Sequence, residues 1–412
     1  MVPQDYRVTM ASRLRRSNPR TLILALLLII GFLLFILSPD KNNDPMLGTP
    51  VPQEVSRKPP PVVRYRMNNL KATAEPITNR EKIIILTPLA KFYDEYWANI
   101  LKLNYPRDLI ELGFIVSKGR EANLALSKLQ DAVHKVQTGK KKEQFSKVTI
   151  LRQDFDSPVS QNEEDRHALS AQKARRSVMS KARNSLLFSV LRPDISWVLW
   201  LDADIIETPS TLIQDLASHN KPVIVPNCFQ RYKDNGVDKI RPYDYNSWHD
   251  SEAALELANS MDKDDIIVEG YHEMATWRFL MTGEYSQGGD IHQETELDGV
   301  GGTALLVKAE VHRDGAMFPP FPFYHLIETE GFAKMAKRLG YQPYGLPNYL
   351  VCSTITLSHI SCADPFRFTI ITNDVFPTLL LNSPPDIIYQ SICLLFSPFF
   401  VYSFSFSIIS PS

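Results

Sequence analysis

Two aspartates separated by one residue follow the most hydrophobic strand-like run of the sequence. Trp197–Leu201 reads WVLWL, and Asp202 and Asp204 come directly after it. In open α/β sheets, ligands bind beyond the carboxyl ends of the strands. Two carboxylates at i and i+2 in that place can present oxygens to one Mg²⁺ or Mn²⁺ ion that keeps open positions for substrate phosphates. The pattern therefore favours metal-assisted chemistry on a diphosphate, and a solvated surface turn carrying two aspartates is the alternative.

A second candidate for chemistry is the glycine-rich stretch 296–302, which reads ELDGVGG. Glycines permit close approach of the backbone to a ligand and unusual backbone dihedral angles. On this interpretation, Glu296 and Asp298 lie near a sugar or near the hydroxyl group that accepts it. A strand that enters a tight turn before Ala304–Val307 explains the same residues equally well.

A third candidate is a group of arginines on one predicted helix, in the segments 174–177 (ARRS) and 182–184 (ARN). The planar guanidinium group binds phosphates through two parallel hydrogen bonds. Arginines on a helix are nevertheless usually solvated, so this pattern alone favours an exposed helix face.

From Glu81 onward, short apolar runs alternate with helical patterns. Strands are predicted at residues 82–87, 109–116, 147–151, 197–201 and 223–225, and helices at 92–103, at 167–191 and from 209 onward. This alternation is typical of an α/β domain in which a mostly parallel sheet is flanked by helices. It extends to residue 351, and it places the Asp-x-Asp pair at the end of a central strand.

The N-terminal region predicts a membrane anchor. Residues 21–37 form an uncharged apolar run that would span about 25 Å as a helix at ~1.5 Å per residue. Arginines precede this run, which predicts that residues 1–20 stay in the cytosol and that the rest of the chain enters a secretory lumen. No small-x-small cleavage site follows Leu37, so an uncleaved signal anchor is favoured over a cleaved signal peptide. The proline-rich residues 38–80 then read as an extended stem or linker.

The net charge and the cysteine count bear on nucleic-acid binding and on disulfide bonds. The formal net charge is −1, which gives no reason to expect a nucleic-acid partner. The chain has four cysteines, and Cys228 stands alone in the body of the predicted domain, so no disulfide framework is expected there.

Several long blocks of this sequence closely resemble glycosyltransferase family 62, the fungal α-mannosyltransferases of the mannan polymerase complexes in the early Golgi. These blocks are WVLWLDADIIETP, KARN at 181–184, the segment from ELDGVGG to AKRLG, and GLPNYLV, and the resemblance covers residues 81–351. It implies a GT-A type, Rossmann-like fold and a single-pass type II topology in the early or cis Golgi membrane. It further implies GDP-mannose as donor and Mn²⁺ as cofactor. The expected reaction is retaining α-1,6 transfer onto mannosides of N-glycans, which extends the mannan backbone within a hetero-oligomer of family 62 subunits.

The resemblance also suggests roles for individual residues. Asp202 and Asp204 match the motif that binds metal and diphosphate, Arg175 matches an arginine near the nucleotide, and Asp244 matches an acidic residue of the active-site region. In the expected mechanism, metal and arginine stabilise the leaving GDP while the acceptor hydroxyl attacks from the same face.

The end of the first strand supplies the last predicted contact. Thr87 and Pro88 stand where folds of this type usually hold the base or ribose of the nucleotide. Both residues are therefore predicted to bind the donor.

The sequence departs from the family pattern after Val351. The family continues with a tyrosine and a metal-binding histidine, whereas here Cys352 and Ser353 follow, so that Ser353 takes the place of the histidine. Residues 352–412 contain no Lys and no Glu and are rich in Ser, Phe, Ile, Leu and Pro, a composition that does not continue an α/β domain. We interpret them as a translated intron or a wrong exon. The missing histidine also raises a second hypothesis, a non-catalytic subunit that organises the complex.

Overall fold

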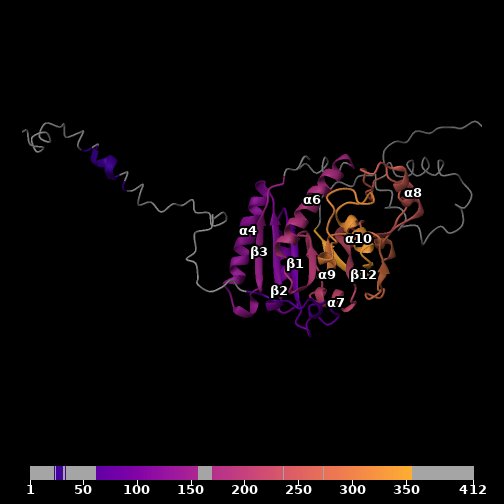
Figure 1. Cartoon of the computed structure of the whole chain (residues 1–412), viewed down its shortest axis with the longest axis horizontal. Coiled ribbons are helices and arrows are strands. Elements are labelled where there is room, and N and C mark those ends of the chain that lie inside the picture. Colours follow the sequence, from indigo (N-terminus) through magenta and orange to yellow (C-terminus); the bar gives the residue numbers. More distant parts are fainter. Residues whose placement is uncertain are drawn as a thin grey trace, which may run out of the picture. The chain divides into compact units, whose positions relative to one another are not determined.

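The computed structural model describes residues 23, 25–30, 33, 62–155, 169–234, 236–271 and 273–354 (Figure 1). The chain divides into two compact units, Met1–Arg64 and Tyr65–Ser412, and the second unit contains the sheet described below. Most of the predicted anchor at 21–37, most of the stem and the tail from 355 onward lie outside the described residues. In the parts of the chain that are described, no helix has the length and apolar character needed to cross a membrane.

One half of the main sheet is parallel, as predicted. Its strands are β1 (Lys82–Leu89), β2 (Ile110–Val116), β3 (Lys147–Arg152) and β4 (Ile195–Leu201). They lie in the order β4-β1-β2-β3, and each neighbouring pair is parallel. All seven residues of β2 and all seven of β4 are buried, which is why these strands read as continuous apolar runs instead of alternating ones.

The other half of the sheet contains both parallel and antiparallel pairs, so the sheet as a whole is mixed and, as predicted, mostly parallel. Its strands are β5 (Ile205–Glu207), β6 (Val223–Asp234), β7 (Val237–Pro242), β10 (Thr295–Glu296), β11 (Ala304–Lys308) and β12 (Pro343–Ser353). β11 lies antiparallel between β4 and β6, while β6 and β12 run parallel to each other.

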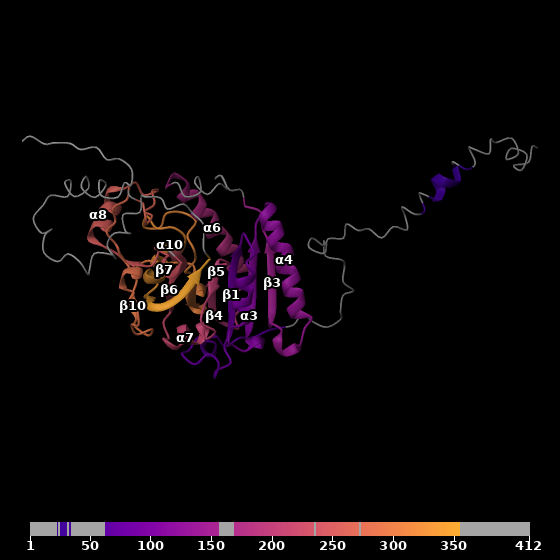
Figure 2. The ribbon, with the colours of Figure 1, turned by 180° about the vertical axis from the view of Figure 1, so that it is seen from behind.

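Helices cover both faces of the sheet. They are α3 (Asp94–Leu101), α4 (Arg120–Gln137), α6 (Leu169–Val190), α7 (Leu212–Ser218), α8 (Glu252–Ser260), α9 (Ala309–Arg313) and α10 (Glu328–Arg338). Single 3₁₀ turns occur at η1 (Met67–Asn69), η2 (Arg107–Leu109), η3 (Lys141–Glu143) and η4 (Met281–Glu284), and a small antiparallel ribbon joins β8 (Trp248–His249) to β9 (Phe279–Leu280). Figures 1 and 2 show α4 and β3 at one side of the domain and α8 at the other.

Strand alternation divides the core into two layers. Trp197 and Leu199 of β4 pack in the layer that also contains residues of α3, α4 and α7. Val198 and Trp200 point to the other face and pack with residues of α6, α9 and α10. Because side chains alternate along a strand, the residue two positions after Trp200 belongs to the α6 face as well. Asp202 is that residue, and the fold therefore directs it toward α6.

Candidate active site at the carboxyl end of β4

The Asp-x-Asp pair lies where three strands meet. The Asp202 N–H donates to the carbonyl oxygen of Thr303, just before β11, at 2.9 Å, and the Thr354 N–H, just after β12, donates to the Asp204 carbonyl at 2.9 Å. The predicted position beyond the carboxyl end of β4 is thus confirmed, and both ends of the turn are tied to neighbouring strands. This anchoring does not fit the alternative of a freely solvated turn.

Arg183 on α6 connects Asp202 to a second carboxylate. Its Nη2 donates to Asp202 Oδ1 at 3.0 Å and to Oδ2 at 3.3 Å, and its Nε donates to Glu328 Oε1 at 3.3 Å. The side chain of Arg183 is only 2% exposed, and its guanidinium lies 5.4 Å from the centroid of the Trp200 ring. Among the described residues, Nη1 of Arg183 has no hydrogen-bond partner, so this buried donor is available for a ligand oxygen.

A second arginine of α6 reaches the same layer. Arg176 forms an ion pair with Glu330 of α10, and its Nη2 donates to Asn246 Oδ1 at 3.1 Å. Arg176 and Arg183 stand seven residues apart, two helical turns, and so share one face of α6. The prediction of a solvated arginine face is wrong for these two residues, since both are buried.

Arg175, the arginine that the resemblance assigned to the nucleotide, directly precedes Arg176 in the chain. Arg175 is half-buried, and its charge acts on the hydroxyl group of Tyr271. Its assignment to the nucleotide stays a prediction, and the structure adds Arg183 as the arginine that contacts the Asp-x-Asp pair.

Negative charge is in excess around Asp202. Burial raises the pKa of its carboxyl group to about 7; Arg183 opposes this shift, and the charges of Asp204 and Glu328 add to it. A bound cation would relieve this excess, because an opposite charge close to a carboxylate favours its ionised form. The electrostatics of the turn therefore suit a positively charged ligand.

Asp204 and Asp244 complete the acidic cluster. The Tyr243 hydroxyl donates to Asp204 Oδ2 at 2.7 Å. Asp244 is buried, accepts hydrogen bonds from the backbone N–H and the side-chain amide of Asn246 at 2.9 and 3.0 Å, and has its pKa raised by burial. The Thr303 hydroxyl lies 3.4 Å from Asp244 Oδ2, and Thr303 also binds the Asp202 backbone. Thr303 therefore links Asp244 to the backbone of Asp202, and the assignment of Asp244 to the active site stays a prediction.

Glu328 is the residue of this cluster that sequence reasoning missed. It begins α10 with a φ of 59°, in the left-handed region that residues other than glycine seldom occupy. Tyr324 and His325, in the loop before it, have φ values of 54° and 60°. Strained backbone of this kind concentrates at functional sites, because the surrounding structure must hold it in place. No local sequence pattern predicts that Glu328 belongs to this site, because only the packing of α10 against α6 brings it to Arg183.

Thr87 does not meet the prediction of a nucleotide contact. It is fully buried, and its hydroxyl group donates to the Leu201 carbonyl at 2.8 Å and lies 2.5 Å from the Tyr96 hydroxyl. Thr87 points to the α3 face of the sheet, opposite to the face that holds Asp202, so it stabilises the junction of β1 and β4 instead. Pro88, the next residue, is half-buried, and its assignment remains a prediction.

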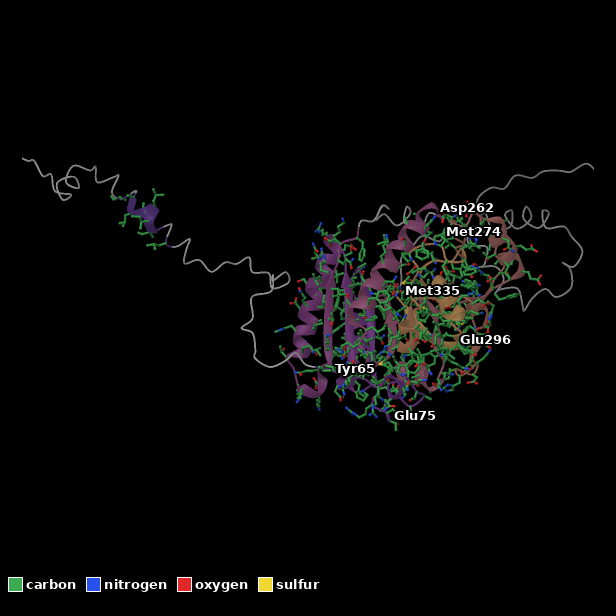
Figure 3. All side chains as sticks on the ribbon, in the orientation of Figure 1. Tyr65, Glu75, Asp262, Met274, Glu296 and Met335 are labelled. Carbon is green, nitrogen blue, oxygen red and sulfur yellow. The ribbon has the colours of Figure 1, made fainter. Side chains whose placement is uncertain are left out.

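Glu296 and Asp298 do not join the cluster either. Glu296 (Figure 3) is exposed beside Tyr344, near the beginning of β12. Asp204, in contrast, accepts a backbone hydrogen bond from Thr354, just after the end of that strand. Asp298 forms an ion pair with Lys337 and accepts a hydrogen bond from the Asp250 N–H at 2.8 Å. Burial raises its pKa, but these two partners outweigh burial and leave the pKa below its usual range. These contacts of both side chains lie outside the Asp202–Asp204 cluster, and their assignment to the sugar or the acceptor hydroxyl stays a prediction.

The glycines that follow Asp298 make room for site residues. A Cβ atom on Gly301 would lie 1.5 Å from Asp244 Oδ2, and one on Gly302 would lie 2.7 Å from Arg183 Nη2. A Cβ atom on Gly299 would lie 2.3 Å from the Trp248 ring. The backbone here therefore approaches the protein's own side chains closely, and an approach to a ligand stays a prediction.

The protein donors fit a divalent ion that takes its other ligands from a substrate. Within the described ranges, no group of three or more His, Cys, Asp or Glu side chains is arranged to hold a metal. Ser353, at the position expected for histidine, is buried and lies beside the Tyr243 hydroxyl. Mg²⁺ and similar ions are commonly held by one or two carboxylates plus substrate phosphates, and Asp202 and Asp204 can supply that number.

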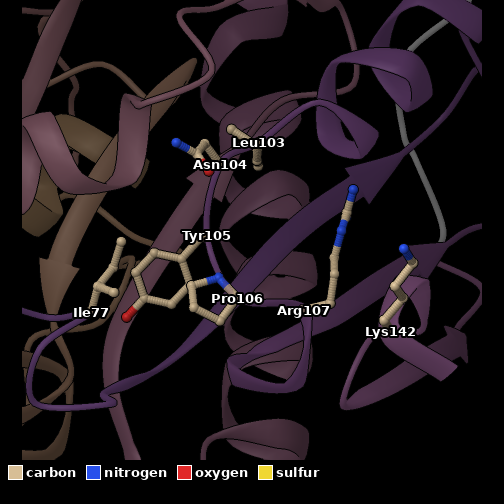
Figure 4. A pocket seen from close by; sticks show the side chains of 7 residues that line it. All are labelled: Ile77, Leu103, Asn104, Tyr105, Pro106, Arg107 and Lys142. Atoms are coloured by element: carbon tan, nitrogen blue, oxygen red, sulfur yellow. The ribbon is translucent and has the colours of Figure 1, made fainter.

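A cavity of about 410 Å³ lies near the N-terminal ends of β1 and β2 (Figure 4). It is lined by Ile77, Leu103, Asn104, Tyr105, Pro106, Arg107 and Lys142. Tyr105 donates to the Glu81 carbonyl at 2.6 Å, and Arg107 lies over the Phe145 ring with 4.5 Å to its centroid. Since this cavity adjoins the start of β1, whereas the Asp-x-Asp pair follows the end of β4, it is not the candidate active site.

Taken together, the sheet and the acidic cluster define an α/β protein with a carboxylate–arginine site suited to a cation and a phosphate-bearing ligand. The Anp1 family profile matches residues 61–322, and this chain belongs to the Anp1 family. It is 55% identical over 313 residues to the mannan polymerase complex subunit MNN9 of Candida albicans, covering 76% of this chain and 83% of that protein. It is 56% identical over 287 residues to the mannan polymerase complex subunit mnn9 of Schizosaccharomyces pombe, covering 70% and 84%.

More distant relatives bear related names. The mannan polymerase II complex ANP1 subunit of Saccharomyces cerevisiae is 37% identical over 297 residues, covering 71% of this chain and 59% of that protein. Among solved structures, the mannosyltransferase PcManGT from Pyrobaculum calidifontis in complex with GDP-Man and Mn²⁺ has a TM-score of 0.37 and 12% identity, covering 70% of this chain and 61% of that chain. That likeness is too low to transfer ligands or fold details.

Proposed function

We propose that this protein is a mannosyltransferase of a mannan polymerase complex. In this proposal it transfers mannose from GDP-mannose to α-mannosides of N-glycans, with retention of configuration, and extends the α-1,6 backbone on a GT-A type scaffold. Membership of the Anp1 family and the names of the relatives support the class. The observation that carries the proposal is the ion-paired arrangement of Asp202, Arg183 and Glu328 at the carboxyl end of β4.

Each side chain of this cluster has its own role in the proposed reaction. Asp202 and Asp204 would hold Mn²⁺, which neutralises charge on the departing diphosphate when bound. Arg183 keeps Asp202 oriented through two hydrogen bonds and offers its remaining donor to a phosphate oxygen. Glu328 fixes the other side of the guanidinium, so the arginine is ordered before the substrate arrives.

The cellular setting belongs to the same proposal. Residues 21–37 serve as a signal anchor that places the catalytic domain in the Golgi lumen, with GDP-mannose and the acceptor glycan on that side. The name "subunit" borne by the relatives supports assembly with other members of the family.

Substitution at the metal site tests the proposal. With GDP-mannose, α-mannobiose and Mn²⁺, the wild-type protein should form a mannotriose, and Asp204→Asn should lower the rate by on the order of 10²-fold or more. Asp131→Asn, on the exposed face of α4, is the matched control and should retain full activity. Equal rates for the wild type and Asp204→Asn would refute the catalytic role.

A non-catalytic subunit is the second candidate. The observation that favours it is Ser353, which stands where the resemblance predicts a histidine ligand. To separate the two, the chain is co-purified with its complex partners, and Asp202→Asn is combined with Asp204→Asn. If the complex assembles and transfers mannose at the wild-type rate, the structural role is supported; loss of transfer with intact assembly supports the catalytic role.

A further inference from the structure

A second cavity, of about 330 Å³, lies on the side of the domain that carries α8. It is lined by Asp250, Ala254, Leu255, Ala258, Asn259, Arg278, Tyr324, His325, Leu326 and Lys334. These residues come from α8, from the ends of the β8–β9 ribbon, from the loop before α10 and from α10 itself. The size falls within the usual range for small-molecule sites, which begins near ~300 Å³.

One wall of this cavity is held by buried ion pairs. Arg278 donates to Asp250 Oδ1 at 3.0 Å and to Glu269 Oε1 at 2.7 Å, and its guanidinium lies 3.5 Å from the centroid of the Trp248 ring. The Trp248 indole N–H in turn donates to Glu330 Oε1 at 3.0 Å. The wall is therefore rigid and packs against the first turn of α10, which also carries Glu328.

The opposite wall is the strained loop that leads into α10. Tyr324 and His325 both have positive φ, and the side chain of Tyr324 is left exposed although it is large and aromatic. The Lys334 ammonium lies 5.5 Å from the centroid of the Tyr324 ring. Four residues after Tyr324, the same loop ends at Glu328, whose carboxylate accepts from Arg183. Backbone strain of this kind clusters at active sites and in ligand-binding segments.

The lining is suited to a neutral polyhydroxyl compound. The lining contains the aromatic ring of Tyr324 and the apolar side chain of Leu255. It also contains three polar groups: the amide of Asn259, the carboxylate of Asp250 and the ammonium group of Lys334. Arg278 already has two carboxylate partners, so Lys334 is the main cationic donor left for an anion. A phosphate group is normally held by several charged or backbone donors, and a pyranose ring by one aromatic face and a few polar groups.

We propose that this cavity binds a hexopyranoside, one sugar unit of the acceptor glycan, at a site distinct from the Asp202–Asp204 cluster. The identity of the sugar as part of an acceptor rests on the proposed function. The pyranose stacks on Tyr324 and Leu255, and its hydroxyl groups bind Asn259, Asp250 and Lys334. An acceptor held there contacts the loop whose end positions Arg183.

Blocking the cavity tests this site. Leu255 is 50% exposed on α8, and Leu255→Trp would fill the space with a side chain that the surface tolerates. Leu124→Trp on α4, where the leucine is 59% exposed, is the matched control. We expect Leu255→Trp to raise the KM for α-mannobiose at least tenfold and to leave the KM for GDP-mannose unchanged, with no effect of Leu124→Trp.

Binding without turnover is measured in parallel. Saturation-transfer NMR with α-mannobiose on the full chain should show contacts that Leu255→Trp abolishes and Leu124→Trp retains. Asn259→Ala, a small exposed change, should weaken the same contacts and replaces Leu255→Trp if that variant unfolds on thermal denaturation.

The outcomes separate this inference from the proposed function. If the wild type transfers mannose and neither Leu255→Trp nor Asn259→Ala changes acceptor KM or binding, the cavity is not a sugar site, and the enzyme assignment stands. If α-mannobiose binds and Leu255→Trp abolishes binding while no variant or wild type transfers mannose, the site stands and the enzyme assignment fails. Displacement of the sugar signals by millimolar inorganic phosphate, with no shift on further sugar addition, would show an anion site and overturn the inference.

Discussion

Arg183 on α6 holds Asp202 at the end of β4 through two hydrogen bonds of 3.0 and 3.3 Å from a single guanidinium nitrogen. The two residues are 19 positions apart in the chain and on different elements. The same arginine also contacts Glu328 on α10, so one buried cation ties the helical layer to the carboxylate pair. This relationship leads to the predictions that follow.

Removal of this cation should destabilise the fold as well as the site. Arg183→Met leaves two carboxylates, those of Asp202 and Glu328, largely enclosed without their partner, which should cost about 3 kcal/mol of unfolding free energy. Arg152→Met, which breaks the more exposed pair with Asp154, is the control and should cost less than about 1 kcal/mol. Urea denaturation of both variants measures the difference, and equal losses would contradict a special role for Arg183.

The raised pKa of Asp202, about 7, predicts a pH dependence of stability. Its ordinary value is 3.8, so the folded state binds more protons than the unfolded state between about pH 4 and pH 7. The contribution of Asp202 to stability is therefore fully present below pH 4 and is lost as the pH rises through 7, at up to roughly 1.4 kcal/mol per pH unit. Denaturation of wild type and Asp202→Asn from pH 4.5 to 8 tests this, because only the wild type should show this loss. Parallel pH profiles would contradict it.

Position 353 should control metal affinity. Ser353 lies at the end of β12 beside the Tyr243 hydroxyl, which donates to Asp204. An imidazole placed there adds a nitrogen ligand next to two carboxylates, and Ser353→His should strengthen Mn²⁺ binding about tenfold or more. Ser353→Ala is the control and should not strengthen it. Mn²⁺ titration followed by electron paramagnetic resonance measures both, and equal affinity in the two variants would place residue 353 outside the metal site.

Gly301 should tolerate no side chain. Its Cβ atom would lie 1.5 Å from Asp244 Oδ2, so Gly301→Ala must displace a buried carboxylate or the turn before β11. We expect a loss of about 1–3 kcal/mol, as in other overpacked sites, together with a fall in transfer activity. Gly283→Ala is the matched control, because nothing lies within 4 Å of its Cβ position and its φ is not positive. Thermal denaturation compares the two, and an unaltered melting temperature for Gly301→Ala would show that Asp244 can move freely.

Much of the α/β scaffold could be predicted from the sequence, because its strands are buried on both faces. The runs that became β1, β2 and β4 are continuous apolar segments, and the helices between them have a period that a single chain reveals. Position relative to a strand was enough to place Asp202 and Asp204 beyond the end of β4. The ribbon β8–β9 was not predicted, since two strands of two residues each carry no periodic signal.

The sequence by itself determined the Asp-x-Asp turn, the family and the buried strands of the parallel half of the sheet, because each is written in a continuous run of residues. Only the tertiary structure decided which helical residues reach that turn. Arg183 and Glu328 are separated by 145 positions and meet through the packing of α10 on α6. Thr87 is the opposite case, a residue that the sequence assigned to the site and the structure places elsewhere. Its position at the end of the first strand suggests a ligand contact, but the alternation of β1 points its hydroxyl group into the core. Side-chain direction and burial follow from long-range packing, which local patterns do not encode.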